Sequence, residues 1–168
     1  DYDYILAFPT AGGHMQEDHL DGVLFDHLIL PGEQKAHISI YADLTALLTS
    51  ADLKWEVPYD MVEWIWIHMA INAGVTSTAA RSGNLENPEE LALNLMNSSS
   101  ELSLAIKAIR EALKVVEARG VNLKLYKAEL LPYKIPAWIA GKAMKVMFAK
   151  NELTRKIMTL HNDKQDIF

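Results

Sequence analysis

The stretch that decides the fold is residues 59–80, which read YDMVEWIWIHMAINAGVTSTAA. Its apolar residues lie on nearly all sides of a helix rather than along one narrow stripe, which is typical of a central, buried helix. Pro58 stands just before this stretch, and a proline in the first turn of a helix loses no backbone hydrogen bond. We therefore predict that residues 59–80 form the central helix of a mainly helical domain.

Further helices are predicted on both sides of this stretch. Residues 89–119 carry apolar side chains at helical spacing, interrupted only by the serines at 98–100, and the pattern stops at Gly120. Shorter helical patterns cover residues 42–50, 127–131, 136–148 and 152–161. We expect at least five helices, without a sequence repeat or a heptad pattern long enough for a coiled coil.

The first forty residues have strand character instead. Residues 5–8 predict a strand broken by the Pro-Thr-Ala-Gly-Gly run at 9–13, residues 22–30 predict a second strand, and 36–40 a third. Residues 54–57 predict a brief strand or an extended link. Because short strands need paired neighbours, we expect residues 1–40 to be the end of a sheet whose beginning lies elsewhere, and residues from about 41 to 168 to be helical.

Composition narrows the class of protein. Of the 168 residues, 50% are hydrophobic and 23% charged, which is ordinary for a globular protein. The net charge of −6 argues against a nucleic acid or an anionic membrane as partner. The chain has no cysteine, so disulfides and thiolate zinc sites are excluded. The most apolar stretch, 61–75, is too short to span a bilayer, and we expect a soluble, cytoplasmic protein.

The best candidate site lies on the predicted central helix. Trp64, His68, Asn72 and Thr76 are four residues apart and therefore form one stripe along it. A buried imidazole and a buried carboxamide must find partners, because an unpaired buried polar group costs roughly 1–3 kcal/mol. A ligand carbonyl, hydroxyl or carboxylate would satisfy both groups, and so would backbone carbonyls of a neighbouring helix. The sequence leaves these two interpretations open.

Other chemical motifs are weak or missing. His14 and His19 flank Glu17 and Asp18 in the first loop, but their spacing matches no common metal site, and we predict no metal. The sequence contains no Ser-His-Asp pattern, no Walker loop and no Gly-x-Gly-x-x-Gly fingerprint.

Three segments resemble one enzyme family, the ketopantoate reductases (2-dehydropantoate 2-reductases). Residues 5–13, ILAFPTAGG, resemble the family's late strand and its Phe-Pro-Gly-Ala-Gly-Gly loop. Residues 66–72, WIHMAIN, resemble its Trp-x-Lys-Leu-x-x-Asn signature, and residues 111–121 resemble its long helix with the Ala-x-Gly-Ile that follows. The three segments occur in the family's order and span most of the chain.

The resemblance implies a two-part oxidoreductase. A Rossmann domain would bind NADP, and residues 1–40 would be the end of this nucleotide-binding domain. Residues 41–168 would form a helical substrate and dimerisation domain, similar to the C-terminal domain of 6-phosphogluconate dehydrogenase, that closes over a small keto or hydroxy acid. Because the dinucleotide fingerprint is missing here, we expect this chain alone to be inactive. Apolar surface on the helices between Glu89 and Phe148 predicts a homodimer. The alternative is a non-enzymatic helical module used for dimerisation or ligand sensing.

The resemblance also assigns roles to the stripe. His68 stands where the family has its catalytic lysine, so it would donate a proton or a hydrogen bond to the keto oxygen. Asn72 matches the family's substrate-binding asparagine, and Thr76 replaces the next one. Because the family's later Ser and Glu motif has no counterpart, we expect a substrate other than ketopantoate.

Overall fold

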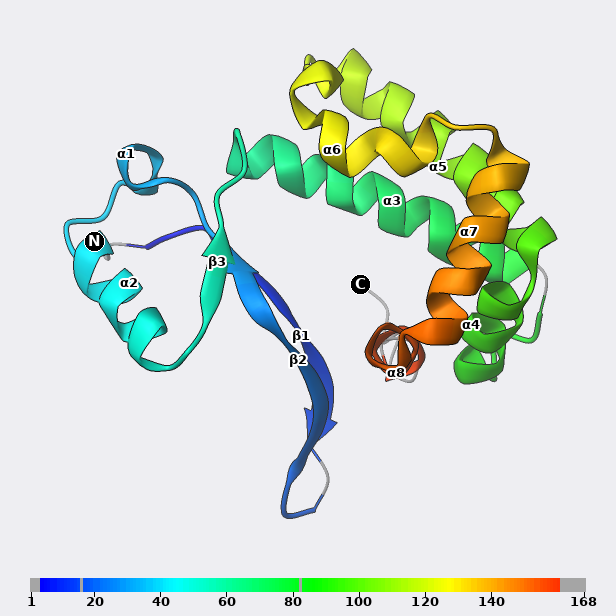
Figure 1. Ribbon diagram of the computed structural model, residues 1–168, viewed down its shortest axis with the longest axis horizontal. Helices are drawn as coiled ribbons and strands as arrows, with labels where there is room; N and C mark the ends of the chain where they lie inside the picture. The colour runs from blue at the N-terminus through cyan, green and yellow to red at the C-terminus, as the bar shows by residue number, and fades with distance from the viewer. Residues whose placement is uncertain (1–3, 16, 82, 161–168) are drawn as a thin grey trace. The chain divides into compact units, whose positions relative to one another are not determined.

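The computed structural model describes residues 4–15, 17–81 and 83–160 (Figure 1). It is mainly helical with a small three-stranded sheet, as the sequence predicted. The chain divides into two compact units. Unit 1 contains the described residues up to Ala11 together with Leu24–Ile65, and unit 2 contains Gly12–Val23 together with the described residues from Trp66 onward. The boundary predicted between residues 40 and 41 concerns a longer protein and stays a prediction.

The sheet has the strand order β1 (Phe8–Met15), β2 (Leu20–Ile29), β3 (Lys54–Glu56). β2 and β3 run parallel, with His27 opposite Lys54. The predicted break at residues 9–13 is wrong, since β1 continues through both glycines. β1 is an edge strand, and a proline is tolerated there because one row of its backbone groups has no strand partner.

The third predicted strand, residues 36–40, is also wrong. This segment holds the end of a short helix, α1 (Glu33–Ala36), followed by His37 in the left-handed conformation with φ of 55°. The third strand is β3, which the sequence described as a brief strand or an extended link. The helix predicted at 42–50 is confirmed as α2 (Tyr41–Ser50).

The central helix is confirmed as α3 (Met61–Arg81), but it starts later than predicted. Its N-terminus is capped by Asp60, whose Oδ1 accepts hydrogen bonds from the backbone N–H groups of Val62 at 3.0 Å and Glu63 at 3.1 Å. A carboxylate cap satisfies N–H groups that a proline cannot, so the helix begins after Asp60. Lys35 stabilises the segment just before this cap, because its Nζ donates a hydrogen bond to the Tyr59 carbonyl at 2.6 Å.

α3 is buried on one face only, which corrects the prediction of a fully buried helix. Its buried residues recur at helical spacing and are Met61, Ile67, Ala70, Gly74 and Thr78. Its opposite face exposes Val62, Trp66 and Met69. Hydrophobic residues all around a helix therefore did not imply burial all around it. Among the helices of the described residues, none is both long and apolar enough to cross a membrane.

The long pattern at 89–119 forms two helices, α4 (Pro88–Asn97) and α5 (Ser99–Ala118). Ser98 separates them, and its hydroxyl accepts a hydrogen bond from the Glu101 N–H at 3.2 Å. This is an N-cap, so the serine run that was expected to interrupt one helix starts a new one. The predicted end at Gly120 is confirmed, with φ of 97°.

α5 provides the core of unit 2. Its buried residues are Leu102, Ala105, Ile106, Ile109, Leu113 and Val116. α7 (Ala137–Lys150) packs against it at Gly141, where an added Cβ would lie 2.6 Å from the Ser99 carbonyl oxygen. The remaining elements are η1 (Leu123–Tyr126), α6 (Lys127–Leu130), η2 (Leu131–Tyr133) and α8 (Glu152–Leu160). The last three predicted helices are therefore confirmed, although His161 lies outside the described residues.

An arginine of α5 forms hydrogen bonds with the connection from α6 to α7. Arg110 Nε donates to the Tyr133 carbonyl at 2.6 Å, and its terminal nitrogen donates to the Ile135 carbonyl. The carbonyls of Tyr133 and Ile135 thereby each accept a hydrogen bond, which partly buried polar groups require.

Candidate functional site

The three predicted site residues lie on successive turns of α3, within unit 2. His68 is half-buried, whereas Asn72 and Thr76 are exposed. Trp64 shares their spacing but lies in unit 1, where its ring contacts Phe8 edge-to-face with centroids 5.2 Å apart. Trp64 is therefore a packing residue, and the candidate site reduces to His68, Asn72 and Thr76.

Burial lowers the pKa of His68 below its usual value of 6.5, because desolvation disfavours the charged imidazolium. At neutral pH the ring is therefore mostly neutral, with one nitrogen that donates and one that accepts. His68 also has an interaction partner within the chain. Its burial thus does not require a ligand, which supports the interpretation of a structurally satisfied histidine as much as that of a binding residue.

The Thr76 hydroxyl is used by the helix itself. It donates to the Asn72 carbonyl at 2.9 Å, a bond to the residue one turn earlier that is common for helical threonines. Its proton is therefore committed, and the oxygen can only accept from a ligand. A ligand at this part of α3 would therefore meet three side chains. His68 offers an imidazole, Asn72 offers a carboxamide that both donates and accepts hydrogen bonds, and Thr76 offers a hydroxyl oxygen that accepts them. This set suits a small polar molecule with a carbonyl and a hydroxyl or carboxyl group.

A cation that the sequence did not single out lies on another face of α3. Arg119, the C-cap residue of α5, stacks on the Trp66 ring with its guanidinium carbon 4.0 Å from the ring centroid. Residues two apart on a helix do not face the same side, so Arg119 does not belong to the His68 stripe. In the sequence, the one indication of its position was that it comes directly before Gly120, where the helix was predicted to end.

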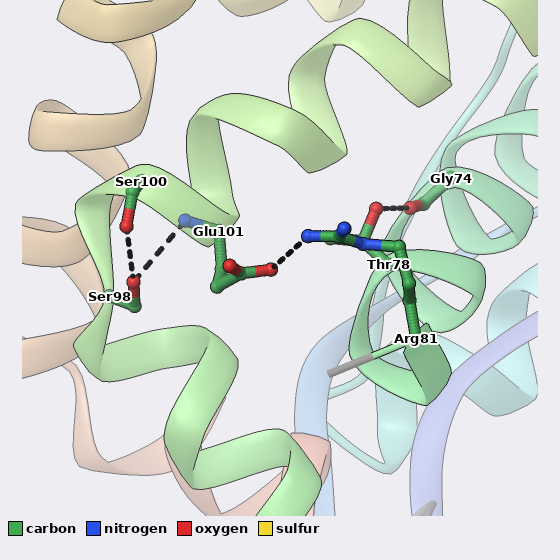
Figure 2. A network of polar contacts seen from close by, with 6 residues as sticks. All are labelled: Gly74, Thr78, Arg81, Ser98, Ser100 and Glu101. Carbon is green, nitrogen blue, oxygen red and sulfur yellow. Dashed lines mark hydrogen bonds and ion pairs between the residues drawn. The ribbon is translucent and has the colours of Figure 1, made fainter. Parts of the chain in front are cut away.

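A polar network fixes the C-terminal half of α3 to the start of α5 (Figure 2). Arg81, the last residue of α3, contacts Glu101 with nitrogen and oxygen 3.4 Å apart. The buried Thr78 hydroxyl donates to the Gly74 carbonyl at 2.8 Å. These contacts hold the helix that carries the stripe, and none of them involves a predicted site residue.

Unit 1 contains an open depression of about 290 Å³, lined by Thr49, Asp52, Leu53, Lys54 and Trp55. None of its lining residues was predicted as functional. Of the predicted His14–His19 loop, His14 lies in strand β1 instead. His19 Nδ1 lies 2.7 Å from the Asp18 carboxylate, and both side chains are exposed. Within residues 4–15, 17–81 and 83–160, no three potential ligands converge on a metal position.

The geometry thus supports hydrogen bonding to a small polar ligand along α3, with His68 as the one titratable side chain of the three residues. Among His68, Asn72 and Thr76 there is no nucleophile with an adjacent base. Comparison of the chain with protein-family models, with curated proteins and with solved structures returns no match.

Proposed function

We propose that this chain is the helical, substrate-binding part of an NAD(P)-dependent oxidoreductase resembling 2-dehydropantoate 2-reductase, acting on a small keto or hydroxy acid. The observation that carries the proposal is the pair formed by half-buried His68 and exposed Asn72, one turn apart on the continuous helix α3. The helical part is proposed to be similar to the C-terminal domain of 6-phosphogluconate dehydrogenase.

In this proposal His68 acts on the keto oxygen of the substrate. Its neutral ring would donate an N–H hydrogen bond that strengthens as negative charge develops on that oxygen. The lowered pKa fits this role, because a neutral imidazole can polarise a carbonyl without being charged beforehand. Asn72 would donate to the carboxylate of the same substrate, and Thr76 would accept from a substrate hydroxyl.

The residues of this chain do not fit the cofactor. Of its eight glycines only Gly12 and Gly13 are adjacent, and both lie within strand β1 rather than in a turn that opens a helix. A pyrophosphate needs such a turn at a helix N-terminus. Any NADP would have to be held by residues outside this chain, and we derive no step through it.

Histidine NMR on the isolated chain tests the binding part of the proposal. Pyruvate and 2-oxobutanoate should shift the ring signals of His68 in a saturable way and should change its titration. Asn72→Ala should weaken this effect at least tenfold, whereas Asn94→Ala, which removes an exposed carboxamide from α4, should leave it unchanged. His68→Gln identifies the ring signals of His68, and His19→Gln identifies those of an exposed histidine that should not respond to the keto acids.

The catalytic part is tested in a longer protein. An upstream coding sequence with a strand followed by Gly-x-Gly-x-x-Gly would supply the missing cofactor site. In that protein His68→Ala should lower kcat by roughly 10²–10³-fold with a smaller change in KM, since it removes a donor used mainly as charge develops. A change in kcat of less than about twofold would show that the imidazole is structural.

A non-enzymatic helical module is the second candidate. It is favoured by the partner that His68 already has within the chain and by the commitment of the Thr76 hydroxyl to α3. In that case no keto acid shifts the His68 ring signals, and no cofactor-binding sequence precedes the chain.

A further inference from the structure

Positive charge is concentrated in one segment of this acidic chain. Residues 121–151 contain six lysines and one glutamate, a net charge of +5, although the whole chain carries −6. The rest of the chain therefore carries −11. Conversely, residues 82–106 contain four glutamates and neither lysine nor arginine. The two segments have opposite charge and both belong to unit 2.

The basic segment presents its charge together with apolar side chains on α7. One side of α7 packs on α5, and the other exposes 61% of Trp138, 39% of Ile139 and 53% of Val146. Lys142 and Lys145 are exposed among them, and Lys142 Nζ lies 5.4 Å from the centre of the Trp138 ring. We call this surface, defined by these five residues, the α7 face. Exposed aromatic and aliphatic groups at this density are typical of a surface that binds another protein.

The acidic segment has matching chemistry at the start of α4. Leu85 exposes 68% of its surface just before the helix, and Glu86, Glu89 and Glu90 are all exposed around it. We call these four residues the α4 entry. Helices α4 and α7 are neighbours within unit 2, in contact with each other and with α5 (Figure 1). Unit 2 therefore carries both an apolar basic part, on α7, and an apolar acidic part, at the start of α4.

We propose that the α7 face binds the α4 entry of a second copy of this chain, in a two-fold symmetric dimer. Two parts of opposite charge on the same unit can pair reciprocally in a two-fold symmetric dimer, in which each part meets the other part of the partner copy. Lysines of the α7 face would pair with glutamates of the α4 entry, and Leu85 would cover apolar surface beside Trp138. The inference is independent of the chemistry proposed for His68, and it specifies which parts of the helices between Glu89 and Phe148 associate.

A charge swap tests this dimer. Sedimentation velocity on the 168-residue chain should show a dimer at micromolar concentration that weakens as NaCl is raised, because the pairs lie at an exposed rim. Lys142→Glu with Lys145→Glu should raise the dissociation constant by about 100-fold or more, since like charges then face each other twice in the dimer. Glu86→Lys with Glu89→Lys should do the same. Glu90 is spared because its side chain accepts a hydrogen bond from the capping residue Asn87 at 3.1 Å.

Mixing the two charge-reversed variants distinguishes the loss of charge pairing between copies from a loss of folding. An equimolar mixture of the two reversed variants should form a heterodimer. A chain that carries all four changes should form a homodimer, because its two reversed surfaces are again opposite in charge. The matched control is Lys107→Glu with Glu117→Lys, two exposed positions on α5 outside both surfaces, which should leave association unchanged.

Three results would overturn the proposal. The first is a chain that stays monomeric up to 100 µM, and the second is a dimer that neither reversed variant weakens. The third is a monomer that sediments with phosphatidylserine vesicles and loses this binding in Lys142→Glu with Lys145→Glu, because the basic face would then serve a lipid surface. Failure of the mixture to form heterodimers, with both variants folded by circular dichroism, would count equally against it.

Discussion

Replacing Gly74 by alanine should destabilise unit 2, although alanine is the better helix former. An added Cβ at this position would lie 2.5 Å from Cγ1, 2.6 Å from the backbone nitrogen and 2.8 Å from Cα of Ile109. The last two atoms belong to the backbone of α5 and cannot rotate away. The two helices would therefore have to separate around the polar contacts that join their ends.

The magnitude follows from two opposing terms. Inserting a methyl group into a packed contact costs about 1–3 kcal/mol, and a contact with backbone lies at the upper end. Exchanging glycine for alanine inside a helix returns about 1 kcal/mol. We expect a net loss of about 1–2 kcal/mol in the free energy of unfolding, which lowers Tm by roughly 2–8 °C for a chain of this length.

Urea denaturation followed by circular dichroism measures this loss. Ser77→Ala, at an exposed position of the same helix, should be neutral or slightly stabilising, since it has the propensity gain without the contact. A Gly74→Ala protein as stable as the wild type would refute the close approach of α3 to α5.

Three further perturbations can be measured in the same way. Arg110→Met should cost about 2–4 kcal/mol in unfolding free energy, because two backbone carbonyls lose a charged donor, and Arg110→Lys should recover only part of it; equal stability of all three proteins would contradict the role given to the guanidinium. Ser98→Ala should cost about 1 kcal/mol through loss of the α5 N-cap, whereas Ser100→Ala, at an exposed position, should be nearly neutral; the comparison fails if the two variants are alike. Burial of His68 keeps its pKa in the folded state below 6.5, so the unfolded chain binds more protons and stability should fall as pH drops below about 6.5. His68→Gln should reduce this fall, and an unchanged urea midpoint profile between pH 5 and 7.5 would show that His68 does not contribute to it.

The helical part of the fold was largely readable from the sequence. Apolar periodicity located α2, α3, α5, α7 and α8. For α5 and α7 the reason is clear, because each packs one side on the other. The end of α5 was also found, since a glycine with positive φ terminates a helix for a local reason. Ser98 was noted as a possible break, but its role as a cap depends on a hydrogen bond that spacing alone does not specify.

The strands were predicted less well, because pairing decides them. Gly12 and Gly13 end a strand by propensity, yet they continue β1 where β2 supplies hydrogen bonds. Residues 36–40 are more apolar than β3, but of these two segments it is β3 that pairs with β2. The burial of α3 was overestimated for a related reason, since sequence shows which side chains are apolar and not which side another helix covers.

For the candidate site, residue spacing predicted which side chains align along the helix, but not which groups those side chains contact. The sequence placed His68, Asn72 and Thr76 on one line of α3, and the helix confirms this alignment. It did not indicate that the Thr76 hydroxyl bonds to its own helix or that His68 has a partner within the chain. Those contacts depend on rotamers and on distant residues, which periodicity does not encode.

The two glycines that touch α5 have a geometric consequence for everything attached to it. Gly74 of α3 and Gly141 of α7 each meet backbone atoms of α5 at a point where only a hydrogen atom fits. If either helix slid along its own axis by one residue, a side chain would arrive at that point and be excluded. The axial register of both helices is therefore set by α5, which places the His68 stripe of one helix and the charged face of the other in a common frame.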